Sequence, residues 1–161
     1  MQFFGAKIYD EISSFQKSEQ DFRDSIRLKL IAGNGGHGLS AMNGYGGKGG
    51  DIVFVSDARL TNLDSVLARY KNGRVLASNG PPSKSAKLIA YPARNVFVNV
   101  PLGVDVFDEE KNLMFSFYKP SVKSVIAKGG EGGNHENGYV GQLGETRMVT
   151  VDLRMIADVG K

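Results

Sequence analysis

Residues 33–51 read GNGGHGLSAMNGYGGKGGD, and residues 128–145 read KGGEGGNHENGYVGQLGE. These two windows hold 16 of the 21 glycines of the chain. Six of them recur at every third position and are predicted to be structural: Gly44, Gly47, Gly50, Gly138, Gly141 and Gly144. Three residues per turn is the repeat of polyproline II, in which a glycine face lets neighbouring backbones touch. The windows therefore predict short polyproline-like arms that pack against one another.

Neither window is a collagen sequence, because the glycine phase slips within each and the whole chain has only five prolines. Backbone amides without a helix or sheet partner must bond across adjacent arms or to water. Glycine permits that close approach at a cost in conformational entropy, which packing must offset. We therefore expect stiff projections of a compact domain rather than flexible linkers.

The overall composition is that of one ordinary domain. The chain has 161 residues, of which 41% are hydrophobic, so it is long enough to bury a core. The absence of cysteine excludes disulfides, thiolate metal sites and cysteine nucleophiles. No apolar run approaches the ~20 residues that a membrane-spanning helix needs, so no membrane partner is expected.

Charge is distributed unevenly along the chain. The net charge is +3, yet residues 1–25 hold three basic and five acidic side chains, which leaves 17 basic and 12 acidic side chains elsewhere. Between Asp64 and Asp105 there is no acidic residue. The basic residues of this acid-free stretch are Arg69, Lys71, Arg74, Lys84, Lys87 and Arg94. Such a stretch favours a polyanionic partner, although a solvated basic face remains the alternative.

The N-terminal extension, residues 1–25, has Ile8, Ile12, Phe15 and Phe22 at spacings of four, three and seven. This pattern predicts an amphipathic helix. Mitochondrial presequences are rich in arginine and nearly free of acids, whereas this extension is acidic. We therefore interpret it as a helix or tail that docks on the domain.

The following residues change to a period of two. Ile26, Leu28 and Leu30 alternate with charged residues, as in a half-buried strand. Further strand-like runs lie at residues 52–55, 74–77, 87–91, 95–100, 104–107, 113–118, 122–127 and 147–153. With one brief helical turn at residues 60–67, this pattern predicts an all-β sandwich or barrel. The proline-bearing segment 78–87 predicts a third arm beside the two glycine windows.

Nucleotide-binding motifs are incomplete. Gly33, Gly35 and Gly38 match G-x-G-x-x-G after a strand, but Gly44 follows too soon to leave room for the helix that would hold a pyrophosphate. A Walker A loop around Lys48 fails, because glycine follows the lysine where serine or threonine is required. Neither motif therefore predicts nucleotide binding.

The two histidines, His37 and His135, occupy similar places in the two windows, and Glu136 is adjacent to the second. Two imidazoles without a thiolate make a thin ligand set for a metal. Two histidines are also too few to define a catalytic triad. We therefore predict no metal site and no catalytic residue.

A rigid glycine-surfaced tip is suited to structured RNA, which proteins recognise largely by shape and 2′-hydroxyls. Small polar side chains and backbone amides can meet phosphates and riboses, and lysines supply a salt-sensitive attraction. The candidate RNA-contacting residues are Lys84, Lys87, His37, Asn34, Lys128, Asn134 and His135. A protein-interaction or regulatory platform without direct RNA contact is the alternative. A small-molecule-binding β-barrel is a weaker third, since it requires a lined pocket.

Five motifs occur in a characteristic order: GNGGHG at 33–38, GGKGGD at 46–51, VPLG at 100–103, VIAKGGEGG at 125–133 and LRMIADVG at 153–160. In this combination they closely resemble the N-terminal Obg domain of the Obg family of GTPases, over about residues 25–160. The short first window is similar to that of the organellar branch of the family called GTP-binding protein 10.

The resemblance implies that residues 26–158 form an Obg fold, an eight-stranded barrel-like base with a glycine-rich bundle of six left-handed polyproline II segments from three loops. Residues 159–161 would begin the linker to a GTPase domain absent from this chain. The implied role is late assembly of the large ribosomal subunit, with the tip reaching rRNA near the peptidyl transferase centre. The implied partners are large-subunit rRNA, a ribosomal assembly intermediate and the GTPase domain. The implied compartment is the mitochondrion, with the nucleolus as the alternative.

In that family the neighbouring domain hydrolyses GTP with magnesium. This chain contains no phosphate-binding loop, magnesium ligand or switch segment, so we expect it to need no cofactor and to lack GTPase activity on its own. The parent protein is expected to be a GTPase that uses GTP and magnesium. Lys161 stands where the family has an apolar residue.

Overall fold

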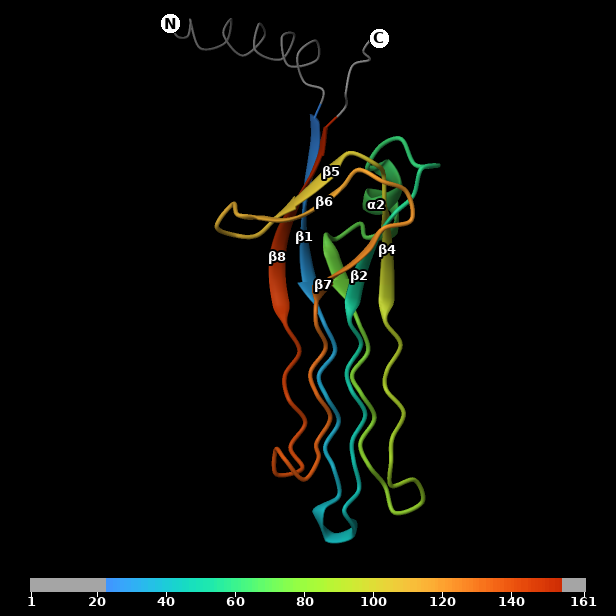
Figure 1. The fold of residues 1–161 in the computed structure, drawn as a ribbon, viewed down its shortest axis with the longest axis vertical. Coiled ribbons are helices and arrows are strands. Elements are labelled where there is room, and N and C mark those ends of the chain that lie inside the picture. Colours follow the sequence, from blue (N-terminus) through green and yellow to red (C-terminus); the bar gives the residue numbers. More distant parts are fainter. Residues whose placement is uncertain (1–22, 155–161) are drawn as a thin grey trace, which may run out of the picture.

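The computed structural model describes residues 23–154, which form a β-structured body and three long arms that project from one end of it (Figure 1). The predicted extension at 1–25 lies outside the described residues except for its last three, which begin the first strand. The predicted linker start at 159–161 also lies outside them.

The regular elements of the described residues are mostly strands, as predicted. Its elements in order are β1 (Arg23–Ile31), a 3-10 turn η1 (Ser40–Met42), β2 (Ile52–Ser56), α2 (Asp64–Arg69), β3 (Arg74–Leu76), β4 (Val96–Val100), β5 (Val104–Phe107), β6 (Leu113–Phe117), β7 (Lys123–Ala127) and β8 (Thr146–Arg154). The brief helical turn predicted near residues 60–67 corresponds to α2. Among the described residues, no helix has the length and hydropathy that a membrane crossing requires.

The strands pair into two sheets. One has five strands in the order β3-β1-β8-β5-β6, and the other has three in the order β4-β2-β7. The long antiparallel β1–β8 pair runs in register from Arg23 opposite Arg154 to Ile31 opposite Thr146. Two neighbouring pairs, β1–β3 and β2–β4, are parallel. Within residues 23–154 the pairings close no ring, so the predicted barrel-like closure is not confirmed.

The core lies between the two sheets, and the alternation in β1 explains which side chains fill it. Ile26, Leu28 and Leu30 are buried, as their period of two predicted. In β2 the Phe54 ring is fully buried and lies 6.4 Å, centroid to centroid, from the ring of Phe117 in β6. Burial of such a ring stabilises the fold by roughly 1.5–3 kcal/mol. The body is therefore a conventional apolar core that can hold the arms in place.

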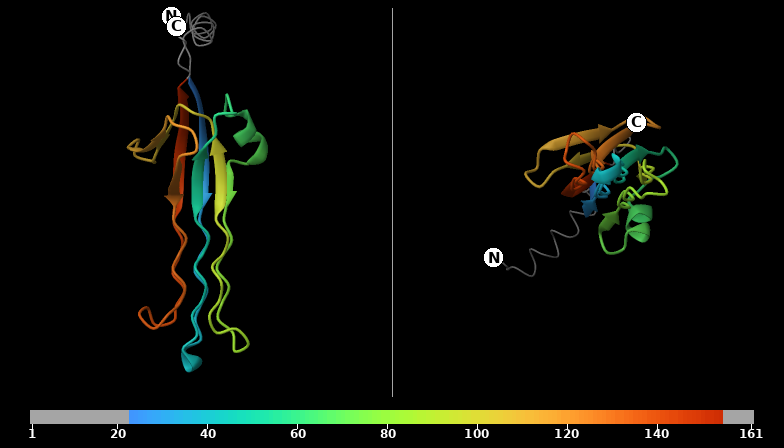
Figure 2. Two further views of the ribbon diagram at one scale, coloured as in Figure 1. Left: turned by 45° about the vertical axis from the view of Figure 1, so that its right-hand side comes forward. Right: turned by 90° about the horizontal axis from the view of Figure 1, so that it is seen from below.

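The sheets determine how the arms are arranged. We call residues 32–51 the first arm, residues 77–95 the second and residues 128–145 the third; they link β1 to β2, β3 to β4, and β7 to β8. Each arm leaves one sheet and returns to the other. Because the orders β3-β1-β8 and β4-β2-β7 correspond, the first arm lies between the other two (Figures 1 and 2).

The predicted strand at residues 87–91 is wrong, and the second arm is longer than the predicted 78–87. Residues 87–91 form part of the returning half of that arm. Their neighbour is the first arm, not a sheet: the Tyr45 amide donates to Leu88 O (2.8 Å), and the Ala90 amide donates to Tyr45 O (3.0 Å). An apolar run predicts an extended backbone, but it does not show whether that backbone pairs with a sheet or with another arm.

Candidate functional site

Backbone hydrogen bonds join the arms with a period of three. The amides of Gly33 and Gly36 donate to the carbonyl oxygens of Gly50 and Gly47, which ties the two halves of the first arm together. The same step recurs between arms: Gly35 to Gln142, Gly38 to Tyr139, Gly46 to Gly133, Gly49 to Gly130, Gly47 to Pro81 and Gly50 to Ser78, all 2.8–2.9 Å. Among the described backbone hydrogen bonds, none joins the second arm to the third. The first arm is therefore the centre of the bundle.

Glycine is required where these backbones touch. A Cβ atom on Gly47 would lie 2.3 Å from Tyr91 O, and one on Gly141 would lie 2.0 Å from Gly35 O. No side chain fits at such separations. Among the six glycines predicted to be structural, Gly50 and Gly144 also face carbonyl oxygens, of Arg94 and Gly33, and Gly44 faces the Ser83 hydroxyl. Gly138 differs, because it lies in a turn with φ of 71° and open space around its Cα.

Asn34 and His37, two of the predicted RNA-contacting residues, act as acceptors inside the bundle. Asn34 Oδ1 accepts the amide of Gly144 at 2.9 Å, and His37 Nδ1 accepts the amide of Gly141 at 3.0 Å. The two side chains are three residues apart, as are the glycines that they bind. Both are exposed, yet each also ties the first arm to the third.

Asn134 and His135 lie at the turn of the third arm. Asn134 Oδ1 accepts the amides of Glu136 (2.8 Å) and Asn137 (3.1 Å), so its side chain organises the turn. His135 Nδ1 shares a 2.5 Å hydrogen bond with the Tyr45 hydroxyl, and the two rings stack with centroids 5.8 Å apart. His135 therefore connects the end of the third arm to the first, whereas Asn134 shapes the turn itself.

Lys84 and Lys87 occupy the end of the second arm. Their backbones exchange hydrogen bonds of 3.0 and 2.9 Å, which closes a tight turn. Both side chains are exposed, and neither takes part in an ion pair among residues 23–154. Lys87 Nζ lies 3.4 Å from the centroid of the Tyr91 ring, a cation–π contact. Positive charge is therefore presented on a fixed turn.

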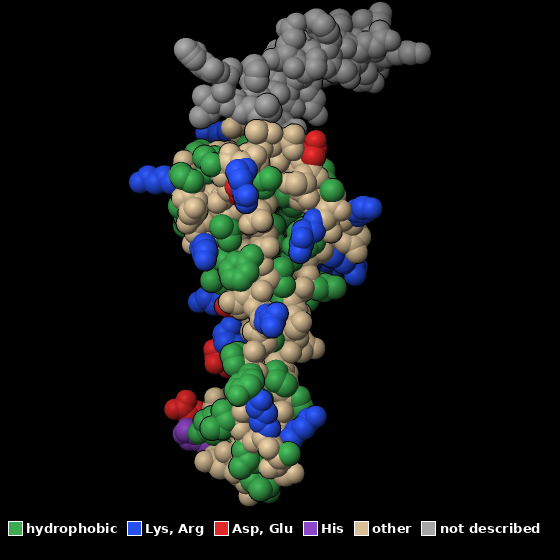
Figure 3. Space-filling model, turned by 90° about the vertical axis from the view of Figure 1, so that its right-hand side faces the viewer, with side chains coloured by type: hydrophobic (Ala, Val, Ile, Leu, Met, Phe, Trp, Pro, Cys, Tyr) green, Lys and Arg blue, Asp and Glu red, His purple; other side chains and the backbone are tan. Residues whose placement is uncertain are grey.

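Figure 3 views the molecule from the side of the second arm and shows basic side chains among hydrophobic ones at its lower end. Ile89 and Tyr91 of this arm are each 69% exposed. The arm carries three basic residues and no acidic one, whereas the third arm carries one lysine and three glutamates. The two outer arms therefore present opposite charges, about +3 and −2 by this count.

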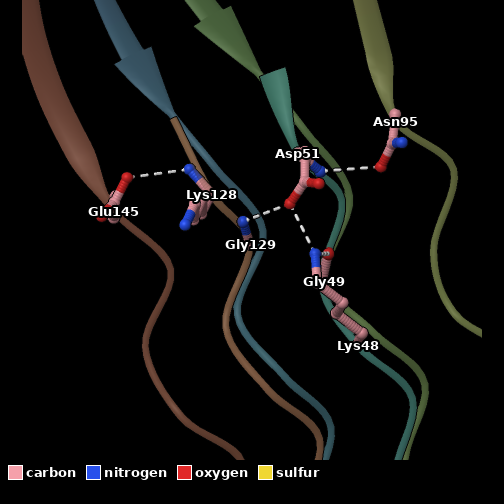
Figure 4. Close-up of polar contacts among 7 residues, drawn as sticks. All are labelled: Lys48, Gly49, Asp51, Asn95, Lys128, Gly129 and Glu145. Atoms are coloured by element: carbon pink, nitrogen blue, oxygen red, sulfur yellow. Dashed lines mark hydrogen bonds and ion pairs between the residues drawn. The ribbon is translucent and has the colours of Figure 1, made fainter. Parts of the chain in front are cut away.

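Lys128, the remaining candidate, lies at the junction of arms and body, which Figure 4 shows. Its amide donates to Glu145 Oε1 (2.9 Å), the amide of Gly129 donates to Asp51 Oδ1 (2.6 Å), and the amide of Asp51 donates to Asn95 Oδ1 (3.0 Å). The three acceptors are the last residues of the three arms. They form a polar collar at the point where sheet pairing ends.

Two electrostatic effects support this collar. Asp51 Oδ1 also receives an ion pair from Lys48 Nζ at 2.5 Å, so one carboxylate holds both a backbone amide and an ammonium. The hydrogen bond from the Lys128 amide, with a further contribution from Arg147, lowers the pKa of Glu145. The lowered pKa means that the Glu145 carboxylate is favoured in the charged form that accepts hydrogen bonds.

Among the described residues, no group of three or more histidines and acids is arranged to hold a metal ion. Sequence reasoning missed three other features of the site: the Tyr45–His135 pair, the Lys87–Tyr91 contact and the polar collar. The Tyr45–His135 pair joins two different arms, and the Lys87–Tyr91 pair lies four residues apart in one arm. No local sequence pattern indicates either contact. The collar had one available signal, since a polar residue precedes each strand that follows an arm.

Comparison with known proteins identifies a family and several longer relatives. A family model described as GTP1/OBG matches residues 23–151. The GTP-binding protein 10 homolog of Drosophila pseudoobscura pseudoobscura is 38% identical over 139 residues, covering 86% of this chain and 36% of the relative. Human GTP-binding protein 10 is 34% identical over 140 residues, covering 87% and 36%.

A bacterial relative gives the same result. GTPase Obg of Wolbachia sp. subsp. Brugia malayi (strain TRS) is 34% identical over 165 aligned positions, covering 87% of this chain and 48% of the relative. The chain therefore spans less than half the length of these relatives. The family match over most of the described residues, together with these identities, means that this chain belongs to the GTP1/OBG family.

Proposed function

We propose that this chain is the RNA-facing module of an Obg-family GTPase that assists late assembly of the large ribosomal subunit. The observation that carries the proposal is the hydrogen-bonded three-armed bundle whose second arm ends in two exposed lysines, neither of which pairs with an acid among residues 23–154. The arms would enter a cleft of immature rRNA near the peptidyl transferase centre.

The charge distribution supports a polyanionic partner. No acidic residue occurs from residue 65 to residue 104, a segment that includes the whole second arm. Lysines that neutralise phosphates release counterions, so they provide affinity without sequence specificity. A narrow probe coated with backbone amides then provides selection by shape, as structured RNA requires.

We infer that the six segments of the arms adopt left-handed polyproline II. The three-residue step of their hydrogen bonds and the glycines at their contacts support this conformation. Backbone φ and ψ angles near −75° and +145° in an experimental structure are the expected result, within about 20°.

We propose that GTP hydrolysis belongs to the part of the parent protein outside this chain, with magnesium as its metal. The names GTP-binding protein 10 and GTPase Obg, given to longer relatives, support this division. Purified alone, this chain should neither bind nor hydrolyse GTP, whereas the full-length parent should do both. GTP binding by the 161-residue chain would contradict the division.

A salt titration tests the RNA contact directly. Affinity of the full chain for large-subunit rRNA fragments should fall linearly in a log–log plot, with a slope of about −0.7 to −0.9 for each phosphate neutralised. The alternative, a platform for protein partners, predicts little salt dependence and no specific crosslinks. Crosslinking of the full-length protein in cells should recover large-subunit rRNA; recovery of other RNAs alone overturns the proposal.

The proposed compartment is the mitochondrion, and the nucleolus is the alternative. Large-subunit rRNA is made in both compartments, so the identity of the crosslinked rRNA also tests location. Mitochondrial rRNA is the expected product, and nuclear-encoded rRNA would favour the nucleolus.

A further inference from the structure

A small hollow near the end of the second arm, lined by residues from both halves of the arm, is not yet used by the proposed function. It has a volume of about 200 Å³ and is lined by Pro81, Pro82, Lys84, Lys87, Ala90 and Tyr91. The prolines and Ala90 make its walls apolar, and the side chains of Lys84 and Lys87 complete the lining. Tyr91 is 69% exposed, and Lys87 Nζ lies over one face of its ring, 3.4 Å from the centroid.

The hollow is held in shape by the bundle. The amide of Ala90 donates to Tyr45 O (3.0 Å), and the amide of Ala93 donates to Lys48 O (2.8 Å), so the backbone on both sides of Tyr91 is fixed. At the end of the arm, Ser83 Oγ donates to Leu88 O at 2.7 Å and closes the turn. A site whose backbone is already ordered loses little conformational entropy when a ligand binds.

The lining selects a particular kind of ligand. An exposed aromatic ring offers a stacking surface to any planar base, and a neighbouring lysine can pair with a phosphate. The second arm has no acidic residue that would repel that phosphate. A base inside a duplex is already stacked and cannot reach such a surface, whereas an unpaired base can. A purely apolar protein segment would leave the two ammonium groups without partners.

We propose that this hollow binds one unpaired nucleotide of RNA, with the base stacked on Tyr91 and the phosphate paired with Lys84 and Lys87. In the free protein the Lys87 ammonium lies over the ring. The base takes its place, and the ammonium turns to the phosphate of the same nucleotide. This inference rests on the proposed function, because it names the element of RNA that the second arm contacts.

The test compares substitutions at two equally exposed positions. Tyr91→Leu removes the ring but keeps an apolar side chain, Tyr91→Phe keeps the ring, and Ile89→Ala changes a residue that is also 69% exposed but does not line the hollow. Fluorescence anisotropy of the full chain is measured with a labelled unstructured oligouridine RNA and with a matched RNA duplex. Thermal unfolding of each variant establishes that the bundle remains folded.

Tyr91→Leu should weaken binding to the single strand by about 5- to 150-fold, the range found when a base-stacking aromatic is removed. Tyr91→Phe and Ile89→Ala should stay within about twofold of the unchanged chain, and duplex binding should respond to none of the three. Equal losses for Tyr91→Leu and Ile89→Ala overturn the nucleotide site, as does unchanged binding in all variants. If the Tyr91→Leu variant is unfolded, Tyr91→Met takes its place and the same criteria apply.

The two proposals fail in different ways. If the unchanged chain has no salt-sensitive affinity for either RNA, the RNA-facing function fails. If the unchanged chain binds and loses affinity when Lys84 and Lys87 are replaced by alanine, but Tyr91→Leu binds as well as the unchanged chain, only the nucleotide site fails.

Discussion

The second and third arms are built by the same packing rule but differ in what they present. Both pack on the first arm through glycines and backbone hydrogen bonds that repeat every third residue. The second ends in exposed lysines beside a half-open aromatic ring, whereas the third is acidic and contacts the first arm through the side chains of His135 and Tyr139. Packing through glycine is therefore common to both outer arms, whereas the charge and the side-chain contacts differ between them.

The largest effects should come from placing a methyl group at the contacts of each outer arm. Gly47→Ala, in the first arm, would place Cβ 2.3 Å from Tyr91 O of the second arm, and Gly141→Ala, in the third arm, would place Cβ 2.0 Å from Gly35 O of the first. Each change should destabilise its arm by about 3 kcal/mol, since backbone atoms cannot move aside as a flexible side chain can. Amide exchange by NMR should report faster opening of the affected arm.

The control is Gly138→Asn, because Gly138 has positive φ, which asparagine tolerates, and open surroundings. It should change stability by less than about 1 kcal/mol. RNA affinity should fall for Gly47→Ala and persist for Gly141→Ala. Equal RNA affinity in these two variants would remove the distinction between the outer arms.

The next effect concerns charge. Replacing Lys84 and Lys87 with alanine should lower RNA affinity on the order of 10- to 100-fold at low salt and reduce the log–log salt slope by about 1.4–1.8. Lys128→Ala removes a charge from the third arm at the collar, where the arm joins the body (Figure 4), and should have a small effect. If Lys128→Ala changes the salt slope as much per charge as the replacement of Lys84 and Lys87 does, the RNA contact is not confined to the end of the second arm.

A smaller effect is expected at the collar. Asp51→Ala removes the acceptor of the Gly129 amide and the partner of Lys48, and should weaken attachment of the third arm by about 1 kcal/mol. Asp51→Asn keeps an acceptor oxygen and serves as the matched control. Faster exchange of the Gly129 amide in Asp51→Ala alone is the expected result. Exchange that is unchanged in both variants would mean that the collar does not hold the arm.

The smallest effect is a pH dependence confined to the third arm. The pKa of Glu145 is lowered in the folded chain, chiefly by the amide of Lys128. Its contribution to stability is therefore complete above the ordinary glutamate pKa near 4.5 and is lost as the pH falls through the lower folded value. The amide resonance of Lys128 should titrate below that ordinary value, and Glu145→Gln should abolish the titration.

The contact between the first and second arms provides the comparison. The amide of Gly50 donates to Ser78 O, with no carboxylate involved, so its resonance should remain constant over the same pH range. Parallel shifts at both amides would indicate loosening of the whole bundle rather than protonation of Glu145.

Much of the body could be predicted from local patterns. Alternation of Ile26, Leu28 and Leu30 predicts β1, because a strand with one buried face has a period of two. The same logic failed at residues 87–91, where an apolar extended run packs on the first arm instead of joining a sheet. Among the candidate site residues, Asn34 and His37 were identified as polar and exposed, but their role as acceptors for the third arm depends on contacts more than 100 residues away in sequence.

By itself, the sequence determined that the arms pack through their backbones, since glycines three residues apart leave no Cβ atoms between neighbouring segments, whatever the rest of the chain does. Only the tertiary structure decided which arm lies in the middle. That order follows from the corresponding strand orders β3-β1-β8 and β4-β2-β7, which come from pairings between distant residues. The same order places the third arm beside the first, where His135 bonds to Tyr45 and Tyr139 bonds to Asn43 across positions about 90 or more residues apart in sequence.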